Sequence, residues 1–151
     1  MRVTRTKIGG GVVGHVQRLI DGVPIVEVGF FPDDRYSDKN NTPVAAVANW
    51  NNKGGGNLPS RPFFDKFLLL CRTAYNSALN RLAKRIISGE INRSRASDEI
   101  GSAAANDLRK IIDDWTDPAN APSVIARKGK NDPLVDTRQM INSVDFKEIH
   151  K

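Results

Sequence analysis

The side chains that could do chemistry in this sequence are two aspartate pairs, two histidines and one cysteine. The pairs Asp33-Asp34 and Asp113-Asp114 could serve general acid–base catalysis, but adjacent residues point in different directions and no partner is positioned beside either pair. A metal site needs clustered ligands, whereas His15 and His150 lie at opposite ends of the chain and Cys71 falls within an apolar run. The spacing therefore predicts no acid–base residue and no metal-binding residue.

Nucleotide binding and covalent catalysis are no better supported. The glycines of Lys53-Gly54-Gly55-Gly56 lack the spacing of a phosphate-binding loop, and no Gly-Lys-Ser or Gly-Lys-Thr follows them. Cys71 has no local signature of a nucleophile, and Ser123 and Ser143 lie outside any nucleophile-elbow motif. We therefore expect no catalytic residue, no cofactor and no enzymatic activity.

The chain is basic, with a formal net charge of +6. Such a charge attracts anionic partners at low salt, whether DNA, an acidic protein face or a membrane surface. Two interpretations of the basic clusters remain open: they are solvated helix faces and loops, or they line one face that contacts DNA phosphates or an acidic partner. Aromatic residues do not interleave with them, which argues against a single-strand binder. The clustered residues are Lys84, Arg85, Arg93, Arg95, Arg127, Lys128 and Lys130.

The size of the chain suits one domain. Its 151 residues, 39% of them hydrophobic, can build one core, so we expect a single domain over 1–151, with 1–22 as an adaptable arm and 23–151 as the body. Cys71 is the single cysteine, which excludes a disulfide framework and favours folding in a reducing cytoplasm. No apolar stretch approaches the length of a membrane span, and the N-terminus leads into glycines rather than a signal-peptide core. We expect a soluble protein with no membrane partner.

The first half of the chain predicts a strand, a short helix and a loop. Residues 23–31 are rich in β-branched and aromatic side chains and predict a strand. A helix should follow over 43–50, capped by Thr42, and should carry Trp50 to a surface or an interface. Three consecutive glycines then predict a mobile loop over 51–57.

Two longer helices follow. The first should run from about Pro62 to Ser88, because apolar residues recur at helical spacing along one stripe. That stripe comprises Phe64, Leu68, Cys71, Tyr75, Leu79, Leu82 and Ile86. The second should begin near 94–97 and end before Asp117-Pro118, and 123–126 should be a short strand or a mobile arm. With a last strand over 143–149, the pattern predicts an α+β fold: a small antiparallel sheet packed against the long helix, plus a second helix and extended loops or arms.

Two short segments point to shape and assembly rather than to chemistry. In 58–64, Pro59 and Pro62 hold Arg61 in extended geometry immediately before an apolar helix. Arg61 could anchor an interface from this rigid loop, together with its neighbours Phe63 and Phe64, or could pair within the chain with a carboxylate such as Asp65 or Asp136. In 131–143, a turn at Asp132-Pro133 precedes a short helix that Asp136 or Thr137 could cap.

In that order, separated by a long helical middle, these segments resemble the tail-completion or neck proteins of long-tailed bacteriophages, the HK97 gene 10 product-like family. The likeness spans roughly 23 to the C-terminus, and its distinctive positions are Val47 to Asn52, Pro59 to Phe63, Pro133 to Thr137, Gln139, Met140 and Ser143. One position departs from the family pattern Asp-Thr-Gly-Gln, because Arg138 stands in place of the glycine. A positive φ there would strain an arginine, so we expect Arg138 to lie in the first helical turn, free to meet an acidic neighbour.

The resemblance implies a structural virion protein that forms a ring at the neck, in head–tail joining or tail completion, as a tail terminator does. It implies six-fold symmetry, with a head connector or stopper protein on one side and a tail tube or terminator protein on the other, and with genomic DNA in the lumen. The interface candidates are Trp50, Arg61, Phe63, Phe64, Asp136, Thr137 and Arg138. The alternative is a small basic DNA-binding protein that acts in packaging or regulation.

Overall fold

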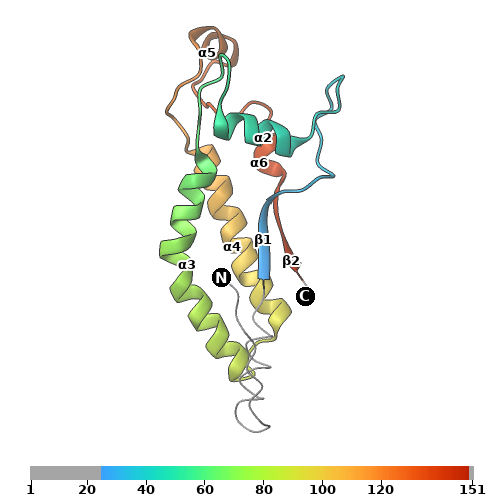
Figure 1. Cartoon of the computed structure of the whole chain (residues 1–151), viewed down its shortest axis with the longest axis vertical. Helices are drawn as coiled ribbons and strands as arrows, with labels where there is room; N and C mark the ends of the chain where they lie inside the picture. The colour runs from blue at the N-terminus through green and yellow to red at the C-terminus, as the bar shows by residue number, and fades with distance from the viewer. Residues whose placement is uncertain (1–24, 150–151) are drawn as a thin grey trace.

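The computed structural model describes residues 25–149 of the chain, so the arm expected over 1–22 lies outside the described residues. The elements in chain order are β1 (Ile25–Phe30), α2 (Val44–Lys53), α3 (Phe63–Ile87), α4 (Arg93–Asp113), α5 (Pro122–Lys128), α6 (Gln139–Asn142) and β2 (Val144–Ile149). The strands pair antiparallel, which confirms the predicted α+β class. Both predicted strands and both long helices are present (Figure 1).

The long helices α3 and α4 form an antiparallel hairpin that is the body of the molecule (Figure 1). Helix α3 ends before Gly89, which adopts a positive φ of 76° that glycine tolerates best. Helix α4 is capped by Asn92, whose side chain accepts a hydrogen bond from the Arg95 amide, so the cap lies before the predicted 94–97. Apolar residues recur at helical spacing along α4, and four of them, Ile100, Ala104, Leu108 and Ile111, are buried.

The two-stranded sheet lies on α4, and α3 packs beside α4 and reaches β1 through Phe64. Val28 of β1 stands opposite Phe146 of β2 in the register. The ring of Phe146 packs directly over Gly101 of α4, where a side-chain Cβ would lie 2.6 Å from Cε2 of the ring. The absence of a side chain at Gly101 therefore sets how closely the sheet approaches the helix.

The apolar stripe predicted for α3 is buried only in part. Tyr75 and Leu82 belong to the core, whereas Leu68 is 53% exposed and Leu79 is 37% exposed. Phe63 and Phe67, one residue earlier in each turn, are buried in the core instead. Leu68 and Leu79 of the predicted stripe are therefore left on an open surface.

Two local predictions were wrong. Helix α2 begins at Val44 without a side-chain cap and continues through 51–53, the first half of the predicted mobile loop, because the helical hydrogen bonds persist until the amide of Gly54 meets the carbonyl of Trp50. Residues 123–126 belong to the short helix α5, which begins at Pro122 and ends at Gly129 in the left-handed conformation.

None of the described helices is both long enough and apolar enough to span a lipid bilayer.

Candidate functional site

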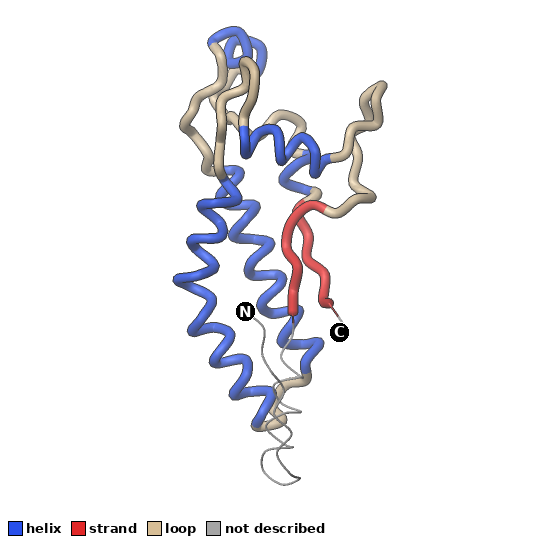
Figure 2. Tube along the Cα trace, in the orientation of Figure 1, coloured by secondary structure: helices blue, strands red, loops and turns tan. Residues whose placement is uncertain are grey.

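The connecting segments 31–43, 54–62 and 114–138 all lie at the end of the molecule opposite the α3–α4 turn (Figure 2). Helix α3 begins and α4 ends at this end, and α2 lies next to α6 at the end of β1 (Figure 1). These three connecting segments are therefore gathered at one pole of an elongated body. We call this region the loop pole.

Arg61 holds the loop pole together from inside. Its side chain is 3% exposed, and its Nε donates a hydrogen bond to the carbonyl of Pro118 at 3.1 Å. Its Nη2 donates to the carbonyl of Ala119 at 3.2 Å, and its Nη1 donates to Oδ1 of Asn51 at 3.3 Å. The planar fork of donors suits several convergent oxygens, and one side chain thus ties α2 and the loop before α3 to the segment after α4. We call this arrangement the Arg61 junction.

The junction corrects both interpretations of Arg61. A side chain that is 3% exposed cannot anchor an external partner, and its internal partners are carbonyl and amide oxygens rather than Asp65 or Asp136. Burial lowers the pKa of the Arg61 guanidinium, because a charged group is less stable away from water. None of the hydrogen-bond partners named here is a carboxylate that would oppose this effect. Arg61 is therefore a structural residue of the loop pole.

The turn after α2 is held by hydrogen bonds. The amide of Gly55 donates to the carbonyl of Leu58 at 2.9 Å, and the Leu58 amide donates back to Gly55 at 3.0 Å. Asn52 accepts the Phe64 amide through its side chain and the Ser60 hydroxyl through its carbonyl. These bonds fix the path of the chain from α2 into α3.

The aromatic candidates divide between core and surface. Phe63 is fully buried and so is not available to a partner, which corrects its assignment to an interface. Phe64 is half-buried and meets Phe30 edge-on, with ring centroids 5.9 Å apart. Trp50 on α2 is 54% exposed. Of the three, Trp50 is the most exposed.

The second distinctive segment lies on the surface beside α6. Asp136 and Thr137 are exposed, and Asp136 lies 3.7 Å from the guanidinium of Arg127. Arg138 precedes α6 with a φ of 63°, so the expectation that it lies in the first helical turn was wrong. Its side chain does meet an acidic neighbour, Asp113, at 3.1 Å. The backbone here has the left-handed geometry for which glycine is best suited.

Arg138→Gly is expected to raise the free energy of unfolding by up to about 1 kcal/mol, because glycine relieves the left-handed strain and the half-exposed ion pair with Asp113 contributes little. Arg138→Ala should be less stable than Arg138→Gly by about 1 kcal/mol. Urea unfolding measures both changes. Asp113→Asn serves as the control for the ion pair, and a glycine variant less stable than the alanine variant would contradict the expectation.

The basic residues do not form one face. Arg85, Arg93 and Arg95 lie at the α3–α4 turn, whereas Arg127, Lys128 and Lys130 lie at the loop pole, at the other end of the molecule (Figure 1). Most are also paired within the chain. The pairs are Arg85 with Glu90 and Glu99, Arg93 with Glu148, Arg95 with Glu99, Arg127 with Asp136, Lys130 with Asp132, and Lys128 with the carbonyls of Asp132 and Val135. Lys84 is exposed on α3. A single DNA-binding face built from both clusters is therefore not present.

Because these cations are divided between two poles and already paired, we expect weak retention on heparin. The purified protein should elute below physiological salt, about 0.15 M. A salt series on heparin and on duplex DNA measures this. Retention above that concentration would contradict the expectation and favour the DNA-binding alternative.

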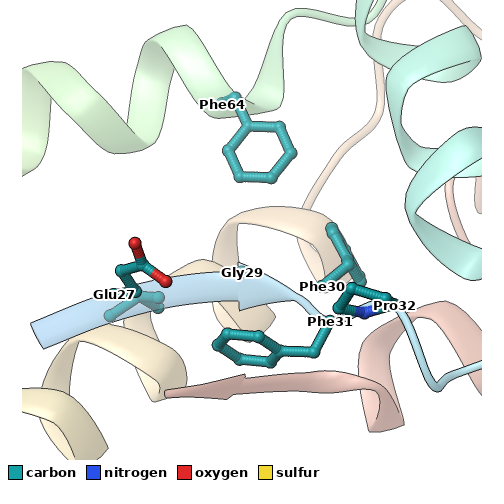
Figure 3. Close-up of a pocket in the computed structure, with 7 residues that line it drawn as sticks. Glu27, Gly29, Phe30, Phe31, Pro32 and Phe64 are labelled. Atoms are coloured by element: carbon teal, nitrogen blue, oxygen red, sulfur yellow. The ribbon is translucent and has the colours of Figure 1, made fainter. Parts of the chain in front are cut away.

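An apolar groove between β1 and α3 was not predicted from the sequence. It is lined by Val26 and Val28 of β1, Leu68 and Cys71 of α3, and Ile100 of α4, among others, and has a volume of about 460 Å³. An adjoining hollow of about 520 Å³ lies between Phe64 and the C-terminal half of β1 (Figure 3). The stripe on α3 could have revealed the groove, but periodicity does not show which part of a stripe is covered.

Within residues 25–149, His, Cys, Asp and Glu side chains do not gather in groups of three that could hold a metal ion. The geometry offers contact surfaces instead: the exposed Trp50, the exposed residues Asp136 and Thr137, and the apolar groove. Comparison of the chain with protein-family models, with curated proteins and with solved structures found no match.

Proposed function

We propose that this protein is a non-enzymatic structural component of a tailed bacteriophage, a tail-completion or neck protein that forms a ring between the head connector and the tail tube. The observation that carries the proposal is the gathering of three long connecting segments at one pole, where the Arg61 junction joins two of them, 54–62 and 114–138. A ring subunit must contact two neighbours and two further rings, so it needs several presented segments on a rigid body. The proposal also depends on the resemblance carried by the two distinctive segments.

Ring closure requires a heterologous interface, in which one patch of a subunit meets a different patch of the next. On the described residues, the loop pole presents the exposed Trp50 and the exposed pair Asp136 and Thr137 as candidates for such patches. Six copies are proposed, following the resemblance, with a connector or stopper protein and a tube or terminator protein as the axial partners. The DNA-binding alternative has no comparable support, because its cations are divided between the two poles.

Trp50→Ala is expected to impair ring formation while leaving the free energy of unfolding within about 1 kcal/mol of the parent protein, since the side chain is 54% exposed. Sedimentation velocity measures the assembly state, and urea unfolding measures stability. Lys53→Ala, at the exposed end of α2, is the matched control and should leave both unchanged. Loss of stability in step with loss of assembly would contradict an interface role for Trp50.

The function itself is tested by electron microscopy of particles grown with an amber codon in place of Trp50 in a host without a suppressor. Filled heads beside unjoined or overlong tails are the expected result. Normal virions would overturn the proposal and direct attention to DNA binding.

A further inference from the structure

The hollow between Phe64 and the C-terminal half of β1 combines aromatic rings with a carboxylate. Phe30, Phe31 and Phe64 line it, and Glu27 is the one acidic residue among the described residues of its lining. Its volume of about 520 Å³ falls within the range of about 300–1,000 Å³ that is usual for ligand pockets. A carboxylate beside aromatic rings favours a cationic ligand, because the face of each ring is negative and attracts a positive charge.

The Phe64 ring and the Glu27 side chain point into this hollow from two different elements (Figure 3). Phe64 extends from the first turn of α3 toward β1, and the carboxylate of Glu27 extends from β1 toward α3. The Phe64 ring is held by its neighbours, because its centroid lies 5.9 Å from that of Phe30 and 4.8 Å from that of Phe63. The hollow therefore has a fixed ring on one wall and a negative charge on another.

The carboxylate of Glu27 is available to a ligand. Glu27 is exposed, and no side chain within the described part of the chain forms an ion pair or a hydrogen bond with it. Its cross-strand neighbour Lys147 is the closest candidate in the register, but Nζ of Lys147 lies over the Phe31 ring, 4.1 Å from the centroid. That contact shows that an aromatic ring of this lining already attracts a cation.

We propose that this hollow binds an arginine side chain of a partner protein. The planar guanidinium stacks on the ring of Phe64 while two of its N–H groups donate to the two carboxylate oxygens of Glu27. The methylene groups of the arginine pack against Phe30 and Pro32. Arginine fits this combination better than lysine, whose ammonium is a strongly hydrated point charge without a planar face. The proposal concerns one surface of the isolated chain and does not depend on the proposed function.

Two small probes of nearly the same shape test the site. N-acetyl-arginine amide carries the proposed side chain, and N-acetyl-citrulline amide replaces the guanidinium by a neutral urea group. In NMR titrations of the isotope-labelled full chain, the arginine probe should shift the amide signals of 27–31 with a dissociation constant on the order of 1 mM. The citrulline probe should bind about tenfold more weakly. Equal binding of the two probes, or no saturable shift up to about 50 mM arginine probe, would overturn the proposal.

Two charge variants locate the binding. Glu27→Gln keeps the size of an exposed side chain and removes its charge, so it should weaken binding of the arginine probe about tenfold and leave the citrulline probe unchanged. Asp98→Asn removes an exposed acid of α4 outside the lining of the hollow, and this matched control should not change binding. Circular dichroism establishes that each variant is folded. Equal effects of the two variants would show that overall charge alone governs binding and would overturn the proposal.

A third probe separates arginine from other cations. N-acetyl-lysine amide has the same charge without the planar group, so it should bind about threefold more weakly than the arginine probe. Phe64→Leu keeps an apolar side chain at the hollow but removes the stacking ring, so the preference for arginine over lysine should disappear. A lysine probe that binds the parent protein as tightly as the arginine probe, or a preference that persists in Phe64→Leu, would overturn the proposal.

Discussion

Arg61→Ala is expected to lower the free energy of unfolding by about 3 kcal/mol and the melting temperature by about 10 °C. The substitution removes the buried guanidinium and leaves the carbonyls of Pro118 and Ala119 and the side chain of Asn51 without their donor. Buried acceptors that lose their partner cost more than the average hydrogen bond contributes. Thermal unfolding followed by circular dichroism measures the loss.

Two further variants define what Arg61 does. Arg61→Lys keeps the charge but not the planar fork, so it should recover less than half of the lost stability. Arg72→Ala, on the exposed face of α3, is the matched control and should stay within about 0.5 kcal/mol of the parent protein. Assembly should fall in parallel with the melting temperature for the Arg61 variants. An Arg61→Ala protein that melts normally but fails to assemble would restore the role of a direct interface anchor.

Gly101→Ala is expected to destabilise the protein by about 3 kcal/mol, although alanine is normally about 1 kcal/mol better than glycine inside a helix. The reason is steric, because the added methyl group would overlap the ring of Phe146, with Cε2 of that ring only 2.6 Å away. The helix and the sheet would have to separate to admit it. Urea unfolding measures the change, and Ser102→Ala on the exposed face of α4 is the control, for which we expect little effect.

The steric cause can be isolated by removing the ring. In a Phe146→Ala background, itself less stable, Gly101→Ala should become neutral or stabilising, because the helix preference for alanine is then unopposed. A Gly101→Ala penalty that persists in this background would show that the contact with Phe146 is not its cause.

The regular elements were predictable from the sequence to the extent that their signals are local. The boundaries of α3 follow from Pro62 and Gly89, and the apolar spacing identifies α4, because each signal acts within a few residues. The helix α5 was missed because Val124, Ile125 and Ala126 are too short an apolar run to separate a helix from a strand by periodicity.

The arrangement of the site was less predictable. The partners of Arg61 are backbone carbonyls of Pro118 and Ala119, and a carbonyl has no signature in a sequence, so the search for a carboxylate partner found the wrong residues. The left-handed backbone at Arg138 could not be predicted from the residue itself, because arginine rarely adopts a positive φ. The one signal was that the family pattern has a glycine at this position. The open groove depends on how β1 is placed beside α3, which no local pattern specifies.

The pairing of β1 with β2 has a consequence for the order of folding. The register joins Ile25 to Ile149, so the sheet brings together the two ends of the described chain and encloses every helix between them. Closing so long a loop is entropically costly until the intervening chain is compact, whereas the α3–α4 hairpin forms from neighbouring residues. We therefore expect the helical hairpin to form first and to act as a template on which the strands meet last. The sheet cannot close until the residues of β2 have left the ribosome, so β1 waits without this partner while all the chain between the two strands is being made.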